Sequence, residues 1–295
     1  MRILLLCLIP LLAACQSRGV LPPPAPIAPE GRDHAQLGQI VELASGQVIT
    51  PQQLVERLAK APRVLVGEQH DNPDHHALQL WLSRELAAQR PQGSLLLEML
   101  NPDQQARVEQ VQAEVRAGRM PVDTIAALAW QPGWDWGLYG ALVQYQLRQP
   151  YPLLAANLDR AEIMQIYQAR PTLQGTASTA PAVQEKLQAD IRESHCGLLP
   201  DSQIPAMLAV QQQRDRRMAE RLLAAPQPAM LLAGAFHVRK DLGVPLHLAD
   251  LGAGEGNLVL ILAEVGKQPA ADSADYVWYT AANTPEDHCA KLRKK

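Results

Sequence analysis

Short apolar runs alternate with longer amphipathic stretches along most of this chain. The short runs are apolar throughout, rather than at every second position, which is typical of strands buried on both faces of a largely parallel sheet. They predict strands at residues 63–66, 94–98, 152–156, 229–234, 245–248 and 257–263. The longer stretches predict helices at residues 51–60, 73–89, 102–117, 140–148, 162–169, 183–193 and 204–224. Because strands and helices alternate, the pattern predicts an α/β fold whose largely parallel central sheet is flanked by helices.

The same pattern divides the chain into regions. Residues 102–225 hold mainly helical stretches and one strand, so we expect a helix-rich cap within a single domain that spans residues 38–295. The charges of the helix predicted at 204–224 indicate a solvent-exposed face. Residues 15–37 contain five prolines between Pro22 and Pro29, which favour an extended tether ahead of the domain.

The first fourteen residues are typical of an export signal. Arg2 precedes an apolar run that is too short to span a bilayer as a permanent helix. The run ends in Leu12-Ala13-Ala14-Cys15, which looks like the lipobox of bacterial lipoproteins. We therefore expect a signal peptide at residues 1–14 and acyl chains such as palmitate on Cys15, or alternatively a plain secretory signal with an incidental cysteine. Gln16, in place of an aspartate, indicates sorting to the outer membrane.

Composition narrows the possible functions. The chain has a net charge of −3, only 4% aromatic residues and no basic stripe, which argues against nucleic-acid binding. Cys196 and Cys289 remain beyond the signal and Cys15, and an even number of cysteines in an exported protein favours a disulfide between them. The alternative is a pair of buried thiols.

Polar side chains follow three of the predicted strands at their carboxyl ends. Glu68 and His70 follow the strand at 63–66, Glu98 ends the strand at 94–98, and His237 follows the strand at 229–234. Open α/β sheets bind ligands beyond the carboxyl ends of their strands, so we expect these four side chains to converge on one cleft. Two imidazoles and two carboxylates can hold a divalent metal ion or carry out general acid–base chemistry. The alternative is a hydrogen-bonded network that only caps the strand ends.

Further histidines and aromatic residues are candidates for the same region. His75 and His76 begin the helix at 73–89, where neighbouring side chains point about 100° apart, so we expect one to face the cleft and the other solvent or the sheet. Residues 130–146 hold three tryptophans and two tyrosines, which form local core or a surface for stacking a flat ligand. His195 lies beside Cys196 before a turn, where a structural role is the simplest interpretation.

Several of these segments together resemble the ChaN-like haem-binding lipoproteins. The matching segments are the lipobox, VGEQHDNPDHHALQ, LLLEM, WDWGLYG, PLLAANLDR, SHCGLLP, QQQRDRRMA and GAFHVRKDLGVPLHL. The family is similar in fold to erythromycin esterases and Tiki-type proteins, some of which are hydrolases. The resemblance implies a binding protein rather than an enzyme, one that takes part in haem and iron uptake together with a haem receptor or transporter.

The resemblance also implies a kind of site. In the family, two ferric haems lie face to face between two monomers, each iron is held by one tyrosine, and a histidine and a lysine of the partner chain hold the propionates. The tyrosine carries over to Tyr139 first and Tyr167 second, with Tyr145 close to the same aromatic cluster. The propionate contacts carry over to His237, His195, Lys240 and Lys186. The alternative function is a metal-dependent hydrolase with the four convergent Glu and His side chains at its centre.

Overall fold

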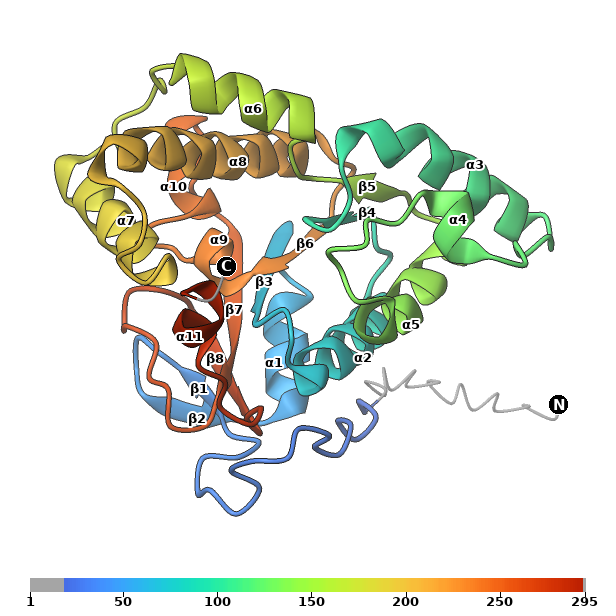
Figure 1. Cartoon of the computed structure of the whole chain (residues 1–295). Coiled ribbons are helices and arrows are strands. Elements are labelled where there is room, and N and C mark those ends of the chain that lie inside the picture. Colours follow the sequence, from blue (N-terminus) through green and yellow to red (C-terminus); the bar gives the residue numbers. More distant parts are fainter. Residues whose placement is uncertain (1–18, 294–295) are drawn as a thin grey trace, which may run out of the picture.

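A mixed sheet crosses the middle of the molecule and carries helices on both faces (Figure 1). The computed structural model describes residues 19–293, and within them the sheet has eight strands in the order β2-β1-β8-β7-β3-β6-β4-β5. The strands from β8 to β5 run parallel, whereas β1 is antiparallel to both of its neighbours. The predicted fold class is therefore confirmed. The strands are β1 (Ile40–Glu42), β2 (Gln47–Ile49), β3 (Arg63–Glu68), β4 (Ser94–Leu97), β5 (Leu153–Ala155), β6 (Ala229–Gly234), β7 (Asn257–Glu264) and β8 (Tyr276–Thr280).

The helices begin where the sequence provides caps. Thr50 forms a capping box at the start of one helix and Asn72 caps the next, each with a proline in the first turn. The helices are α1 (Pro51–Leu58), α2 (Pro73–Gln89), α3 (Gln105–Arg116), α4 (Thr124–Leu128), α5 (Trp136–Leu147), α6 (Arg160–Ala169), α7 (Pro181–Ser194), α8 (Ile204–Ala224), α9 (Ala235–Val238), α10 (Val244–Asp250) and α11 (His288–Leu292), with short 3₁₀ turns at Pro102–Gln104 and Asp201–Gln203.

One predicted strand is wrong. Residues 245–248 belong to α10, a short buried helix that Pro245 opens at its first turn. Val244 and Leu248 are four residues apart, so they lie on one helix face and both enter the core. A four-residue apolar run does not distinguish a buried strand from a turn of buried helix, which explains the error.

Three strands are missing from the sequence-based prediction. β1 and β2 have three residues each, too few to show a pattern, and they pair antiparallel at one edge of the sheet. β8 is the five-residue run YVWYT, rich in aromatic and β-branched residues, and it is buried throughout. The short helices α4, α9 and α11 are also absent from the prediction.

The core has one layer on each face of the sheet. Successive residues of a strand point to opposite faces, and in β3 Val64 and Val66 enter one apolar cluster while Leu65 enters the other. The first cluster packs against α1, α2 and α5, and the second against α8 and α10. The carboxyl ends of β3, β4 and β6 are therefore enclosed by helices on both sides.

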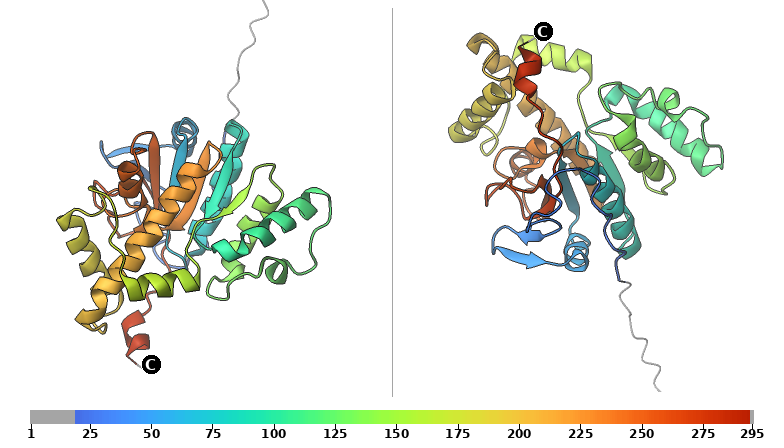
Figure 2. Two further views of the ribbon diagram at one scale, coloured as in Figure 1. Left: turned by 90° about the horizontal axis from the view of Figure 1, so that it is seen from above. Right: turned by 60° about the horizontal axis from the view of Figure 1, so that its bottom comes forward.

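The helix-rich region between residues 102 and 225 lies in two groups. Helices α3, α4 and α5 pack together beside α2, whereas α6 and α7 pack along α8 on the other side of the sheet ends (Figures 1 and 2). Among the helices of residues 19–293, none combines the length and the apolar character that a bilayer crossing requires.

Residues 19–29 of the proline-rich segment form no helix or strand, and they lie against the domain. Asp74, in the first turn of α2, accepts hydrogen bonds from the backbone N–H groups of Ile27 and Ala28. Farther upstream, the Trp81 indole donates to the carbonyl of Leu21. The part of the predicted tether within residues 19–37 is thus held on α2. The predicted signal peptide and Cys15 lie outside the described residues.

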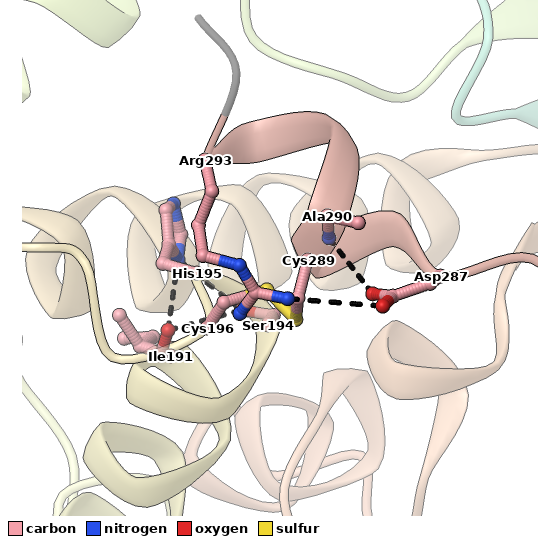
Figure 3. The surroundings of a disulfide bond; sticks show 8 residues. All are labelled: Ile191, Ser194, His195, Cys196, Asp287, Cys289, Ala290 and Arg293. Carbon is pink, nitrogen blue, oxygen red and sulfur yellow. Dashed lines mark hydrogen bonds and ion pairs between the residues drawn. A yellow bond between two sulfur atoms is a disulfide. The ribbon is translucent and has the colours of Figure 1, made fainter.

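The predicted disulfide is present. Cys196, just after α7, is bonded to Cys289 in α11, with 5.6 Å between the two Cα atoms (Figure 3). The bond joins the C-terminal segment to the end of α7 across 93 residues of sequence. The alternative of two free thiols is excluded.

Candidate functional site

Three neighbouring strands deliver polar side chains to one place. β3, β6 and β4 are adjacent in the sheet, and Glu68 ends β3, Glu98 follows β4, and His237 lies in α9 directly after β6. His70 follows β3 and lies beside Glu68, and the Glu98 carboxylate accepts a hydrogen bond from the backbone N–H of Gly234 at 2.8 Å. The predicted convergence of the four side chains is confirmed.

Glu68 is the centre of the first half of this network. Its carboxylate is buried and accepts a hydrogen bond from the Tyr139 hydroxyl at 2.5 Å. The Nδ1 atom of His70 lies 2.9 Å from the same oxygen, and the Nδ1 atom of His76 lies 3.1 Å from the other. Burial lowers the pKa of His70, but the hydrogen bond to Glu68 and the charges of Glu98 and Glu68 outweigh burial. The pKa of His70 is therefore raised above its usual value.

His237 lies between two buried carboxylates in the second half of the network. Its Nδ1 atom is 2.5 Å from Asp215 and its Nε2 atom is 3.3 Å from Glu98. Burial opposes the charged imidazole, but the charges of Glu98 and Asp215 outweigh burial and raise the pKa of His237 to about 10. Burial likewise opposes the Glu98 carboxylate, yet the charge of His237 holds the pKa of Glu98 well below its usual value. Around neutral pH His237 is therefore an imidazolium and Glu98 a carboxylate.

Asp215 is a site residue that the sequence analysis missed. It belongs to α8, whose charges we expected to face solvent, but Asp215 is fully buried. The signal was present in the spacing, because Leu208, Asp215 and Leu222 recur every seven residues and therefore share the buried stripe of the helix. A carboxylate on such a stripe needs a cationic partner, which is His237.

His75 and His76 point in different directions, as expected. His76 faces Glu68, and its Nε2 atom contacts the carbonyl of His70. His75 faces the sheet, where its Nε2 atom lies 2.9 Å from Thr280 Oγ1 and its Nδ1 atom accepts the backbone N–H of Gln69. Burial lowers the pKa of His75 well below its usual value, so His75 is a neutral structural residue.

The aromatic cluster of residues 130–139 is local core. Trp130 contacts both Trp136 and Tyr139 with ring centroids 5.2 and 6.0 Å apart, and Trp134 lies 5.9 Å from Tyr139. Trp134 also meets the ring of His70 edge-on at 4.9 Å. The cluster therefore holds Tyr139 and His70 in place around Glu68.

In this structure the four convergent side chains pair with their neighbours. They are arranged as two hydrogen-bonded groups, one around Glu68 and one around His237. Within residues 19–293, no group of three or more His, Cys, Asp or Glu side chains is placed to hold a metal ion. Glu68 and His70, the first pair of expected metal ligands, contact each other, and so do Glu98 and His237.

A cavity of about 640 Å³ opens above these strand ends, within the size range of ligand pockets. Its polar end is formed by Glu68, His70, Gln211 and His237. Its walls come from α7, α9, the end of β7 and the loop after β7, and most of them are apolar: Leu187, Ile191, Phe236, Leu242, Ile261 and Pro269.

The tyrosines expected to bind iron differ in accessibility. Tyr139 is buried, and burial together with the charge of Glu68 raises the pKa of its phenol far above the usual value. Tyr145 is half-buried and stacks its ring against the guanidinium of Arg84. Tyr167, on α6, is half-buried, and its hydroxyl makes no hydrogen bond to any residue within 19–293. The remaining three, Tyr151, Tyr276 and Tyr279, are buried.

The residues expected to contact propionates also differ. His237 is buried between Asp215 and Glu98, so it is not available to a ligand of another chain. Lys186 and Lys240 are exposed enough to reach a ligand, although they pair with Asp241 and Asp275. His195 is half-buried, and its Nδ1 atom lies 2.8 Å from the carbonyl of Ile191, while its Nε2 atom has no hydrogen-bond partner within residues 19–293.

Comparisons with known proteins identify the family to which this fold belongs. No curated protein matches the chain. The solved structure described as "Cofacial heme binding to ChaN of Campylobacter jejuni" has a TM-score of 0.75 and 28% identity, and the match covers 83% of this chain and 97% of that chain. Two other solved structures are more distant. A succinoglycan biosynthesis protein has a TM-score of 0.46 and 12% identity, and the match covers 78% of this chain and 73% of that chain. An erythromycin esterase mutant in its open conformation has a TM-score of 0.47 and 13% identity, and the match covers 86% of this chain and 85% of that chain. The sequence profile of the family described as "Haem-binding uptake, Tiki superfamily, ChaN" matches residues 54–248, well over half of the chain. The chain therefore belongs to the ChaN family of haem-binding uptake proteins in the Tiki superfamily.

Proposed function

We propose that this protein is a haem-binding lipoprotein of the outer membrane that takes part in haem and iron uptake. The observation that carries the proposal is the match of the family profile over residues 54–248, and the similarity of the fold to ChaN of Campylobacter jejuni supports it. That protein is described as binding haem cofacially. By analogy, two ferric haems stack between two copies of this chain.

Tyr167 fits the role of iron ligand better than any other tyrosine. A tyrosine ligand binds ferric iron as the phenolate, so it has to lose its proton and reach the haem. Tyr139 donates its proton to a buried carboxylate, which opposes both requirements. Tyr167 has an unpartnered hydroxyl within residues 19–293, and Met164, one helical turn earlier on the same face of α6, exposes an apolar side chain on which a porphyrin can lie.

The facing copy of the chain contributes the contacts to the haem propionates. His195, Lys186 and Lys240 are the candidates, because their side chains are partly exposed, whereas His237 is buried. A lysine ammonium and an imidazole N–H both donate to carboxylates, and such charge-assisted hydrogen bonds are the stronger kind. An iron with a single axial ligand at a subunit interface suits transfer to a receptor or transporter.

A haem titration tests the proposal. Ferric haem is added to the purified protein while absorption and molecular mass are recorded. We expect saturation at one haem per chain, the spectrum of a five-coordinate phenolate complex, and a mass twice that of the monomer. The absence of any Soret shift at one equivalent of haem would refute haem binding, and a saturated monomer would refute the cofacial dimer.

Two matched variants test the ligand. Tyr167→Phe removes only the hydroxyl, so we expect loss of the phenolate spectrum with little change in stability. Tyr145→Phe is the control, because its half-buried ring is held by Arg84 and its loss of a hydroxyl leaves the ring in place. A phenolate spectrum that survives in Tyr167→Phe and disappears in Tyr139→Phe would assign the iron to Tyr139 instead.

The lipid anchor is tested separately, since Cys15 and the signal peptide lie outside the described residues. We expect cells fed labelled palmitate to incorporate it into the wild-type protein and not into Cys15→Ser. We also expect the wild type to fractionate with outer membranes. Equal labelling of the two proteins, or recovery of the wild type in the soluble periplasmic fraction, would contradict the anchor.

A further inference from the structure

A separate cavity lies between α6 and α8, two helices that pack along each other (Figure 1). Its volume of about 320 Å³ is near the lower end of the range for small-molecule sites. The carboxylates and imidazoles of the strand ends do not line it. Apolar side chains such as Leu158 and Ile166 form one part of the lining, and the four charged residues Glu162, Arg216, Arg217 and Glu220 form another. A ligand of this cavity is therefore small and meets both charged and apolar groups.

Arg216 is a buried cation in this lining. The residue is 8% exposed, and its Nη2 atom donates to the backbone carbonyl of Gln174. Within residues 19–293, no carboxylate forms an ion pair with its guanidinium. Its Nη1 atom has no hydrogen-bond partner in the same part of the chain and stays accessible to solvent. A buried charge without a counter-charge costs free energy, so this position favours an anionic group supplied by a ligand.

The other carboxylates of this region do not neutralise Arg216 by direct contact. Glu162 pairs with Arg217 at 2.6 Å, and Asp250 accepts backbone N–H groups of the linker between α6 and α7. Glu220 follows Arg216 by four residues, so the two lie on one face of α8, where Cβ atoms are roughly 5–6 Å apart. Glu220 is exposed and lines the cavity, and it forms no ion pair or hydrogen bond within residues 19–293. Among the described lining residues, the cavity thus offers one unpaired positive charge and one unpaired negative charge.

We propose that this cavity binds a small zwitterion with an apolar body, such as the amino acid leucine. The ligand carboxylate accepts hydrogen bonds from Arg216 Nη1, and such charge-assisted bonds are the stronger kind. The ligand ammonium pairs with Glu220, and the apolar body lies against Leu158 and Ile166. Because the four charged residues of the lining sum to zero, a ligand with one charge of each sign leaves the site neutral. An anion that lacks the ammonium brings a second negative charge close to Glu220 and is disfavoured.

Calorimetric titration of the purified full chain with leucine tests the proposal. We expect saturation at one leucine per chain with a Kd of about 1 mM or tighter. Arg216→Gln removes the cation that holds the carboxylate, so its affinity for leucine should fall at least about tenfold. Arg107→Gln is the matched control, because Arg107 is an exposed arginine on α3, outside the cavity, and its affinity should equal that of the wild type.

Two analogues of leucine test the two ligand charges separately. Isocaproate lacks the ammonium and isoamylamine lacks the carboxylate, so we expect each to bind the wild type at least about tenfold more weakly than leucine. Glu220→Gln removes the partner of the ammonium and the repulsion that isocaproate meets. In this variant leucine should therefore lose its advantage over isocaproate.

Three outcomes would overturn the proposal. They are no saturable binding of leucine at about 10 mM, equal affinities of Arg216→Gln and the wild type, and a preference for leucine over isocaproate that persists in Glu220→Gln. If thermal unfolding shows that Arg216→Gln does not fold, the comparison in Glu220→Gln decides alone, because that residue is exposed. Tyr167 does not line the cavity, so Tyr167→Phe should keep leucine binding whether or not the protein binds haem.

Discussion

Two buried carboxylates, Glu68 and Glu98, carry most of the polar contacts at the strand ends. An unpaired carboxylate in such a place would cost several kcal/mol, on the order of the desolvation penalties known for buried ions. Each carboxylate has an imidazole within hydrogen-bond reach, and Glu68 has Tyr139 in addition. The stability of the fold should therefore depend on the protonation of His237 and on the hydroxyl of Tyr139.

His237 gives the fold a dependence on alkaline pH. Its pKa of about 10 in the folded protein exceeds the value of 6.5 for an unperturbed imidazole, so its stabilising contribution is complete below pH 6.5 and is lost as the pH rises towards 10. A tenfold change in proton affinity corresponds to about 1.4 kcal/mol, so we expect a loss on the order of a few kcal/mol over this window. The lowered pKa of Glu98 acts in the opposite sense, since its contribution is lost in acid. Urea denaturation between pH 6 and pH 10 measures how the free energy of unfolding depends on pH. An equal pH dependence in His237→Gln would contradict this assignment.

Tyr139→Phe should destabilise the fold without changing its shape. The substitution removes a hydrogen bond to a buried charge, which is worth about 1.5–3 kcal/mol. Tyr279→Phe is the control, because Tyr279 is also buried but its hydroxyl has no hydrogen bond within residues 19–293, and we expect a change below about 0.5 kcal/mol. Chemical denaturation measures the free energy of unfolding of both variants. Equal losses of stability would contradict the stabilising role of the hydrogen bond from Tyr139 to Glu68.

The sequence predicted those site residues that strands deliver directly. Glu68, His70, Glu98 and His237 follow buried runs, and parallel strands end at the same edge, so their proximity follows from the fold class. Tyr139 and Asp215 come from α5 and α8, whose packing against the strand ends depends on tertiary contacts that no local pattern contains. The choice of Tyr167 over Tyr139 likewise needed burial and hydrogen bonding, which neighbouring residues in the sequence do not determine.

At the scale of elements, α9 sets the position of His237, and its approach depends on Gly67 in β3. A Cβ atom at Gly67 would meet Val238 Cγ2 at 2.5 Å and Ala235 Cα at 2.9 Å, and both belong to α9. No side chain can therefore stand between this strand and this helix. The prediction of β3 from its apolar run was sound, but α9 has only four residues, too few for a helical pattern.

Gly67→Ala should push α9 away from β3. Overpacking of this kind costs about 1–3 kcal/mol, so we expect a lower free energy of unfolding and a displaced His237. Gly133→Ala is the matched control, because a Cβ atom there would have no neighbour within 4 Å. Denaturation curves that coincide for Gly67→Ala and the wild type would show that the helix is not held against the strand as described.

At the scale of the whole molecule, the first and last described segments are fastened to the domain and also to each other, since Glu30 and Ala282 exchange two backbone hydrogen bonds. The N-terminal segment is held on α2 through Asp74 and Trp81. The C-terminal segment is held up to Asn283, whose backbone N–H donates to Glu264, and then by the disulfide of Cys289. The disulfide was predictable from cysteine number and export, whereas the docking of the proline-rich segment was not, because proline content predicts extension and not the surface against which a segment lies.

Removal of the disulfide should destabilise the protein by about 2–4 kcal/mol, since closing a loop of 93 residues restricts the unfolded chain. The double variant Cys196→Ser/Cys289→Ser tests this expectation by chemical denaturation, and the wild type in dithiothreitol should match it. The double variant itself should not respond to dithiothreitol, which controls for other effects of the reductant. Because Cys196 comes two residues after the end of α7, the disulfide restrains this end of the helix, and hydrogen exchange there should become faster when the bond is removed. Unchanged stability together with unchanged exchange would mean that the other contacts of the C-terminal segment suffice to hold it.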